Sequence, residues 1–64
     1  MLDEELKNEI KEHIEGLLFV RSFRNENRSD DKDVEMIVEL YRSTKVDDSK
    51  EIREFARGVF NESK

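Results

Sequence analysis

The sequence contains no cysteine and no proline, and it has only two glycines, Gly16 and Gly58. Without cysteine the chain can form neither disulfide bonds nor thiolate metal sites, and its single histidine cannot provide a His/Cys ligand set. Proline and glycine are the residues that tight turns and hairpins use most, so their scarcity favours helices over strands. We therefore expect an all-α protein with no metal centre and no cofactor.

The longest uninterrupted apolar run, Leu17–Val20, has four residues, whereas a membrane-spanning helix needs about 20. The N-terminal residues Asp3, Glu4 and Glu5 are acidic, whereas a signal peptide begins with basic residues. Together with the lack of cysteine, these features predict a cytoplasmic protein that does not span a membrane.

Apolar residues recur at three- and four-residue intervals in three segments, which predicts three helices. The first is expected from Asp3 to Arg24, the second from Asp30 to Thr44 and the third from Asp48 to Asn61. A polar loop precedes the second helix, and a short turn precedes the third. A three-helix bundle, with the order helix–loop–helix–short turn–helix, is the simplest way to bury three apolar stripes in a single domain over residues 1–64.

Capping residues support these boundaries. Asp3 is suited to cap the first helix and Ser29 or Asp30 the second, while Asp48 and Glu51 are spaced like a capping pair for the third. The predicted shared core consists of Leu6, Ile10, Ile14, Leu17, Val34, Ile37, Tyr41, Ile52, Phe55 and Val59. Replacing Phe55 with alanine is expected to cost about 3–5 kcal/mol.

Four large apolar residues fall outside the stripes of their own helices: Phe19, Phe23, Met36 and Leu40. Leaving such side chains in water forfeits roughly 1.5–3 kcal/mol of burial for each one. The run Leu17–Val20 has two interpretations. Either the helix bends at Gly16 or is covered on two sides by its neighbours, or the run belongs to an intermolecular interface. The second interpretation predicts a homodimer.

Three arginines lie near the end of the first predicted helix: Arg21, Arg24 and Arg28. Arginine beside aromatic residues such as Phe19 and Phe23 is typical of the side chains that contribute most to protein–protein binding. Arginine at a helix C-terminus also stabilises the helix dipole by itself, so both interpretations stay open. The predicted partner-binding residues are Phe19, Arg21, Phe23, Arg24, Arg28, Met36 and Leu40.

Few residues suggest catalysis or metal binding. Asp30, Asp31 and Asp33 are spaced like the start of a calcium loop, but the glycine and the distal glutamate that such a loop requires are missing. His13 lies among the apolar positions of its helix. A half-buried histidine at the core edge, or a pH-sensing group at a subunit contact, explains this position without catalysis. We therefore expect that the protein is not an enzyme.

The segment from Met36 to Val59 reads MIVELYRSTKVDDSKEIREFARGV. It resembles the opening of a transposase- or resolvase-type helix-turn-helix and covers about a third of the chain. The resemblance implies DNA binding by a recognition helix that follows the Gly58-Val59 step. Only residues 60–64 follow that step, so we expect the groove-reading helix to be absent.

The distribution of charge also disfavours direct nucleic-acid binding. The net charge is −5, and residues 1–20 carry six acidic and two basic side chains, whereas residues 21–28 carry three basic and one acidic. Such a surface is repelled by phosphates over most of its area. The sequence therefore predicts an acidic protein-interaction module that acts as an inhibitor, adaptor or regulatory subunit of a larger protein. The alternative is a nucleic-acid-linked regulator, either a helix-turn-helix remnant or an acidic mimic that occupies a DNA-binding groove.

Overall fold

Three α-helices account for most of the described chain, which comprises residues 2–24, 29–42 and 48–63 of a computed structural model. Helix α1 spans Glu4–Arg24, α2 spans Asp30–Tyr41 and α3 spans Ser49–Glu62. The all-α three-helix bundle is therefore confirmed, and the described residues contain no strand. The predicted end of the second helix at Thr44 lies outside the described residues.

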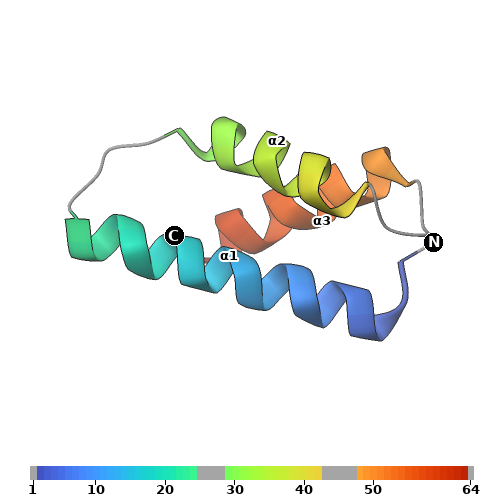
Figure 1. Cartoon of the computed structure of the whole chain (residues 1–64), viewed down its shortest axis with the longest axis horizontal. Coiled ribbons are helices and arrows are strands. Elements are labelled where there is room, and N and C mark those ends of the chain that lie inside the picture. Colours follow the sequence, from blue (N-terminus) through green and yellow to red (C-terminus); the bar gives the residue numbers. More distant parts are fainter. Residues whose placement is uncertain (1, 25–28, 43–47, 64) are drawn as a thin grey trace.

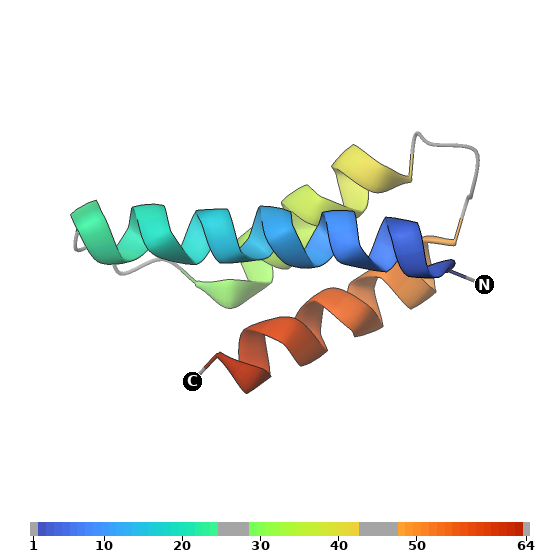
Figure 2. The same ribbon diagram turned by 90° about the horizontal axis from the view of Figure 1, so that it is seen from below.

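The longest helix, α1, runs the length of the molecule, and the two shorter helices lie along it (Figure 1). Helix α2 runs opposite to α1, whereas α3 returns in roughly the direction of α1 and crosses it at an angle (Figure 2). The closest packing is between α2 and α3. No described helix combines the length and the apolar character needed to cross a membrane.

Two of the predicted N-caps are confirmed. The Oδ1 atom of Asp3 accepts a hydrogen bond from the backbone N–H of Leu6 at 2.7 Å, and Oγ of Ser29 accepts one from the N–H of Asp31 at 3.2 Å. Each bond satisfies a backbone donor that the first turn of a helix leaves without an intrahelical acceptor. These caps fix where α1 and α2 begin.

The predicted capping pair of the third helix is wrong. Asp48 occupies the N-cap of α3, but its side chain makes no capping hydrogen bond. The Oε2 atom of Glu51 instead accepts the backbone N–H of Leu2 at 3.1 Å. This bond ties the start of α1 to the start of α3, and it helps to explain why Leu2 is only 4% exposed.

The core is formed by one apolar stripe from each helix. Its buried members are Leu2, Leu6, Ile10, Ile14, Val34, Ile37, Val38, Ile52, Ala56, Val59 and Phe60. Three predicted core residues, Leu17, Tyr41 and Phe55, are only partly buried at its edge. The third helix faces both other helices, so its innermost side is centred on Ala56 and Phe60 rather than on Phe55.

Candidate protein-binding surface

Arg21 lies inside the bundle, where its side chain is 13% exposed. Its Nη2 atom is 3.0 Å from Oδ1 of Asp30, and its Nε atom is 3.5 Å from Oδ2 of Asp33. The guanidinium carbon is 5.7 Å from the ring centroid of Phe60, within the range of a cation–π contact. One arginine of α1 thus contacts both α2 and α3, and Arg21 does not belong to the outward-facing side of α1.

The inward direction of Arg21 fixes the outward direction of two aromatic residues. Phe19 and Phe23 each lie two positions from Arg21, and two positions correspond to about 200° around a helix at 3.6 residues per turn. Both side chains therefore point away from α2 and α3. They are 71% and 83% exposed, respectively.

Val20 continues this surface toward α2. The O–H of Tyr41 on α2 donates a hydrogen bond to the backbone carbonyl of Glu9 at 3.4 Å and lies 3.5 Å from Nδ1 of His13. The side of α1 that carries His13 therefore faces α2. Val20 follows His13 by seven residues, which is almost two full turns, so it lies on the same side. It is 45% exposed.

Met36 and Leu40 lie on the α1 side of α2. The opposite side of α2 is defined by Glu35, whose carboxylate pairs with Arg53 of α3 at 2.7 Å. The α1 side is defined by Asp33, which pairs with Arg21. Met36 lies three positions after Asp33, and Leu40 lies four positions after Met36, so both follow the α1 side. Leu40 is 47% exposed, and Met36 is partly buried.

These apolar residues lie along the outside of α1 and the adjoining edge of α2, and we call them together the outer apolar face. Its members are Phe19, Val20, Phe23, Met36 and Leu40. Four of them were predicted as partner-binding residues; the seven-residue spacing from His13 is the signal that also identifies Val20. Arg24 is exposed at the end of α1, and Arg28 lies outside the described residues.

The alternatives for the run Leu17–Val20 can now be separated. Helix α1 is unbroken through Gly16, and the neighbouring helices cover Leu17 and Leu18 only in part. They leave Phe19 and Val20 exposed. The bundle alone therefore does not bury the whole run.

His13 is itself exposed rather than half-buried, and its ring meets that of Tyr41 edge-on with centroids 6.1 Å apart. Burial is the largest cause that raises the pKa of Tyr41 above its ordinary value of 10.0, and the negative charges of Glu9 and Glu12 raise that pKa further. The contact positions the end of α2 against the middle of α1.

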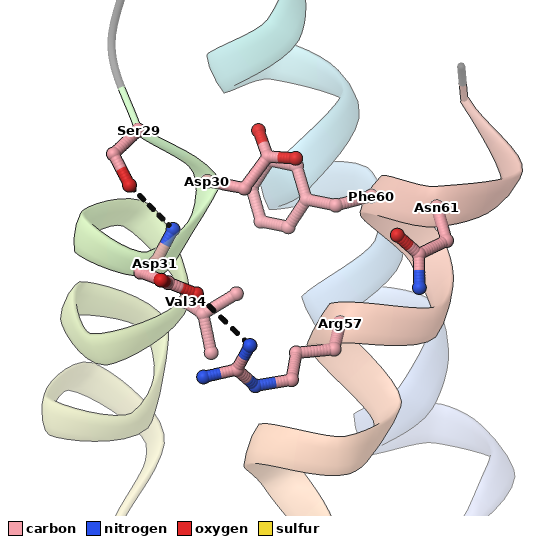
Figure 3. A pocket seen from close by; sticks show the side chains of 7 residues that line it. All are labelled: Ser29, Asp30, Asp31, Val34, Arg57, Phe60 and Asn61. Carbon is pink, nitrogen blue, oxygen red and sulfur yellow. Dashed lines mark hydrogen bonds and ion pairs between the residues drawn. The ribbon is translucent and has the colours of Figure 1, made fainter.

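A depression of about 320 Å³ lies between the start of α2 and the end of α3 (Figure 3). Several of its polar groups are engaged within the chain. The guanidinium of Arg57 pairs with Oδ1 of Asp31 at 2.9 Å, and the Ser29 hydroxyl caps α2. An apolar floor is supplied by Val34 and Phe60. Asp30, the remaining charged residue of the lining, pairs with Arg21 of α1. Because each charged group here has a partner of opposite sign within the chain, the depression offers no focused charge to a ligand.

The three aspartates at the start of α2 do not converge on one point. Asp30 and Asp33 are directed to Arg21 of α1, whereas Asp31 is directed to Arg57 of α3. Within residues 2–24, 29–42 and 48–63 no group of three His, Cys, Asp or Glu side chains is arranged to hold a metal ion.

Helix α3 continues without interruption through Gly58 and Val59 to Glu62. The helix-turn-helix resemblance implied a separate recognition helix after this step. The two arginines of α3, Arg53 and Arg57, are paired with Glu35 and with an aspartate of α2. They brace α2 against α3.

A comparison of the chain with models of protein families, with curated protein sequences and with solved structures finds no match in any of the three.

Proposed function

We propose that this chain is a cytoplasmic protein-interaction module that acts by binding rather than by catalysis, as an inhibitor, adaptor or regulatory subunit of a larger protein. The outer apolar face is the binding surface. The observation that carries this proposal is the exposure of two neighbouring phenylalanines, Phe19 at 71% and Phe23 at 83%, on a rigid helix. Large apolar side chains grouped on the surface of a small protein mark interaction sites.

The energetics support a binding role. Burying a large apolar side chain is worth roughly 1.5–3 kcal/mol, and aromatic residues lead the side chains that dominate interfaces. Phe19 and Phe23 are placed on the rigid backbone of a 21-residue helix. Few further rotatable bonds of this chain therefore become ordered when a partner covers them. Preorganisation of this kind reduces the entropic cost of association.

The nucleic-acid-linked alternative has weaker support. Direct binding to nucleic acid depends on lysine and arginine side chains that can reach its phosphates. The two arginines of α3, Arg53 and Arg57, are engaged with carboxylates of α2, and the chain as a whole carries a net charge of −5. We therefore retain the protein-binding role as the proposal.

Affinity capture from a lysate of the source organism, followed by mass spectrometry, tests the proposal. The parent chain is compared with Phe19→Asp, which places a charge in the outer apolar face. The matched control is Asn61→Asp, which adds the same charge at an exposed position of α3. A partner protein should be enriched by the parent and by the control and lost with Phe19→Asp. If no protein shows this dependence while both variants keep the helical circular dichroism of the parent, the proposed function is wrong.

A further inference from the structure

Gly16 lies in the interior of α1 although nothing in the fold requires a glycine there. A Cβ atom built at this position meets no other atom within 4 Å, so alanine would fit without a clash. Glycine is less favourable than alanine inside a helix. The residue is exposed and adjoins Phe19 and Val20, which follow it by three and four positions. The missing side chain therefore leaves a notch in the helix surface beside Phe19 and Val20.

The notch belongs to a regular stripe. Glu12, Gly16, Phe19 and Phe23 follow one another at intervals of four, three and four residues, which is the spacing of the seam through which one helix packs on another. All four are exposed. The seam thus presents a small residue, Gly16, next to a large one, Phe19. A second seam of the same kind would complement it, because the large residue of each could pack over the small residue of the other.

The charges of α1 determine the direction in which two such helices can pair. From Glu4 to Glu15 the helix carries five acidic and two basic residues. Residues 16–24 carry no acidic residue and two arginines, of which Arg21 points into the bundle and Arg24 is exposed. A parallel pair would place like charges together. An antiparallel pair places the end of each helix that carries the exposed Arg24 beside the acidic half of the other, and it also aligns the two helix dipoles favourably.

We propose that the outer apolar face binds a second copy of this chain, with the two α1 helices antiparallel about a two-fold axis and with Phe19 of each copy packed over Gly16 of the other. The exchange is reciprocal, as a two-fold interface requires. In the same register, Phe23 of one copy lies opposite Glu12 of the other. The hydroxyl of Tyr41 bonds to the carbonyl of Glu9, so the end of α2 lies beside this part of α1. Phe23 of the other copy therefore also lies close to the end of α2, where Leu40 is exposed.

The size of the contact is sufficient for a weak dimer. A phenylalanine side chain buries roughly 150–250 Å², so at their exposures of 71% and 83% the four from two copies, with Val20 and Leu40 of each, bring the total to at most about 1,000 Å². This is at the lower end of specific interfaces, for which dissociation constants on the order of micromolar are usual. The inference rests on one part of the proposed function, that the outer apolar face is a binding surface, and it names a second copy as an occupant of that face.

Sedimentation equilibrium over roughly 1–500 µM tests it, a range chosen to bracket micromolar association. The parent should shift from monomer to dimer. Phe19→Asp should weaken dimerisation by about a hundredfold or more, because the charge is buried twice. Gly16→Ala should weaken it by roughly tenfold, because two methyl groups fill the notches, while the melting temperature of the monomer stays equal or rises. If Gly16 had a purely structural role, Gly16→Ala would not weaken dimerisation while leaving the melting temperature of the monomer unchanged or higher.

A residue exchange tests the register. Gly16→Phe alone sets two phenylalanines against each other, and Phe19→Gly alone sets two glycines against each other, so each single variant should dimerise less well than the parent. The double variant Gly16→Phe/Phe19→Gly restores one large and one small residue in each contact and should recover dimerisation to within about tenfold of the parent. Failure of the double variant to improve on both single variants overturns the proposed register.

The outcomes also separate this inference from the proposed function. A chain that stays monomeric at the highest concentration, yet captures another protein in a Phe19-dependent manner, overturns the dimer and leaves the binding role intact. A chain that dimerises through Phe19 and Gly16 without capturing any other protein supports the dimer and contradicts the regulatory role.

Discussion

Arg21 and Asp33 form an ion pair between side chains that are 13% and 1% exposed, with Nε and Oδ2 3.5 Å apart. The pair joins the last turns of α1 to the first turns of α2, and Asp33 is the only buried polar or charged residue among those that the structure describes. A buried carboxylate depends strongly on its cation, because removing one partner leaves a charge in a medium that solvates it poorly. The stability of the bundle therefore depends on this contact more than on any surface ion pair.

We expect Arg21→Leu to cost about 3–5 kcal/mol, which is comparable to the whole stability of a bundle of this size, about 3–5 kcal/mol. Urea unfolding followed by circular dichroism measures the loss. The double variant Arg21→Leu/Asp33→Leu should recover most of it, since two packed apolar residues replace the pair. The matched control is Arg42→Leu, because Arg42 is exposed and forms a 3.8 Å pair with Glu39; a cost below about 1 kcal/mol is expected there. Equal costs for Arg21→Leu and the control would contradict the prediction.

Phe60→Ala should destabilise the protein more than Phe55→Ala does. Phe60 is 2% exposed, whereas Phe55 is only partly buried at the edge of the core. Truncating a fully buried phenylalanine costs about 3–5 kcal/mol, and truncating one at the core edge costs roughly 2 kcal/mol. The order of the two melting temperatures decides the matter: Phe55→Ala melting below Phe60→Ala would mean that α3 is rotated from the orientation described.

The contrast between these two phenylalanines shows what periodicity can predict. Intervals of three and four residues predicted all three helices, and the caps at Asp3 and Ser29 were readable because capping is local. Which residue lies deepest depends on how α3 is rotated between two neighbours, and that rotation depends on contacts far apart in the sequence. Asp33 was missed as a buried residue for the same reason, since its place follows from Arg21 on another helix.

The exposed apolar face was largely predictable, because it consists of residues left over when each helix has presented one stripe to the core. Phe19, Phe23 and Leu40 were identified in this way, and the structure leaves all three exposed. Arg21 looked like part of the same surface, since it lies between the two phenylalanines in the sequence. A helix separates neighbours in sequence by 100° each, and Arg21 follows the buried Ile14 by seven residues, so helical spacing already places it on the inner side of α1. Its ion pairs with Asp30 and Asp33 depend on where α2 lies, which the sequence pattern does not show.

The contribution of Glu35 to stability should depend on pH. Its hydrogen bond from Arg53, and then the positive charges of Arg53 and Arg57, hold the pKa of Glu35 below its ordinary value of 4.5. A carboxyl group whose pKa is lower in the folded state contributes stability above the unfolded pKa, and that contribution disappears as the pH falls through the folded pKa. Glu35→Gln should therefore be less stable than the parent at pH about 7 and equal to it at pH about 2–3.

Urea unfolding at both pH values, with and without added salt, measures this difference. Because both side chains are substantially exposed, at 54% for Glu35 and 40% for Arg53, the difference should be small and should shrink in high salt. Glu39→Gln is the control, since Glu39 contacts only the more distant Arg42 among the described ion pairs. A difference between Glu35→Gln and the parent that grows as the pH falls would contradict the prediction.

The direction of pairing between two copies should be readable from two spin-label distances. The chain has no cysteine, so Glu5→Cys and Ser22→Cys, both at exposed positions of α1, each accept a single label. With Phe19 packed over Gly16 of the other copy, the two-fold axis passes between residues 17 and 18. At a rise of about 1.5 Å per residue, the labels at position 5 should then lie about 40 Å apart and those at position 22 about 15–20 Å apart. A parallel pair would give about 10–20 Å at both positions, because helices packed side by side lie about 8–10 Å apart along their whole length.

Double electron–electron resonance on dimers of each labelled chain measures the two distances, with Phe19→Asp added to each as the monomer control. Equal short distances at both positions would exclude the antiparallel arrangement, whereas one long and one short distance that both vanish with Phe19→Asp would establish it.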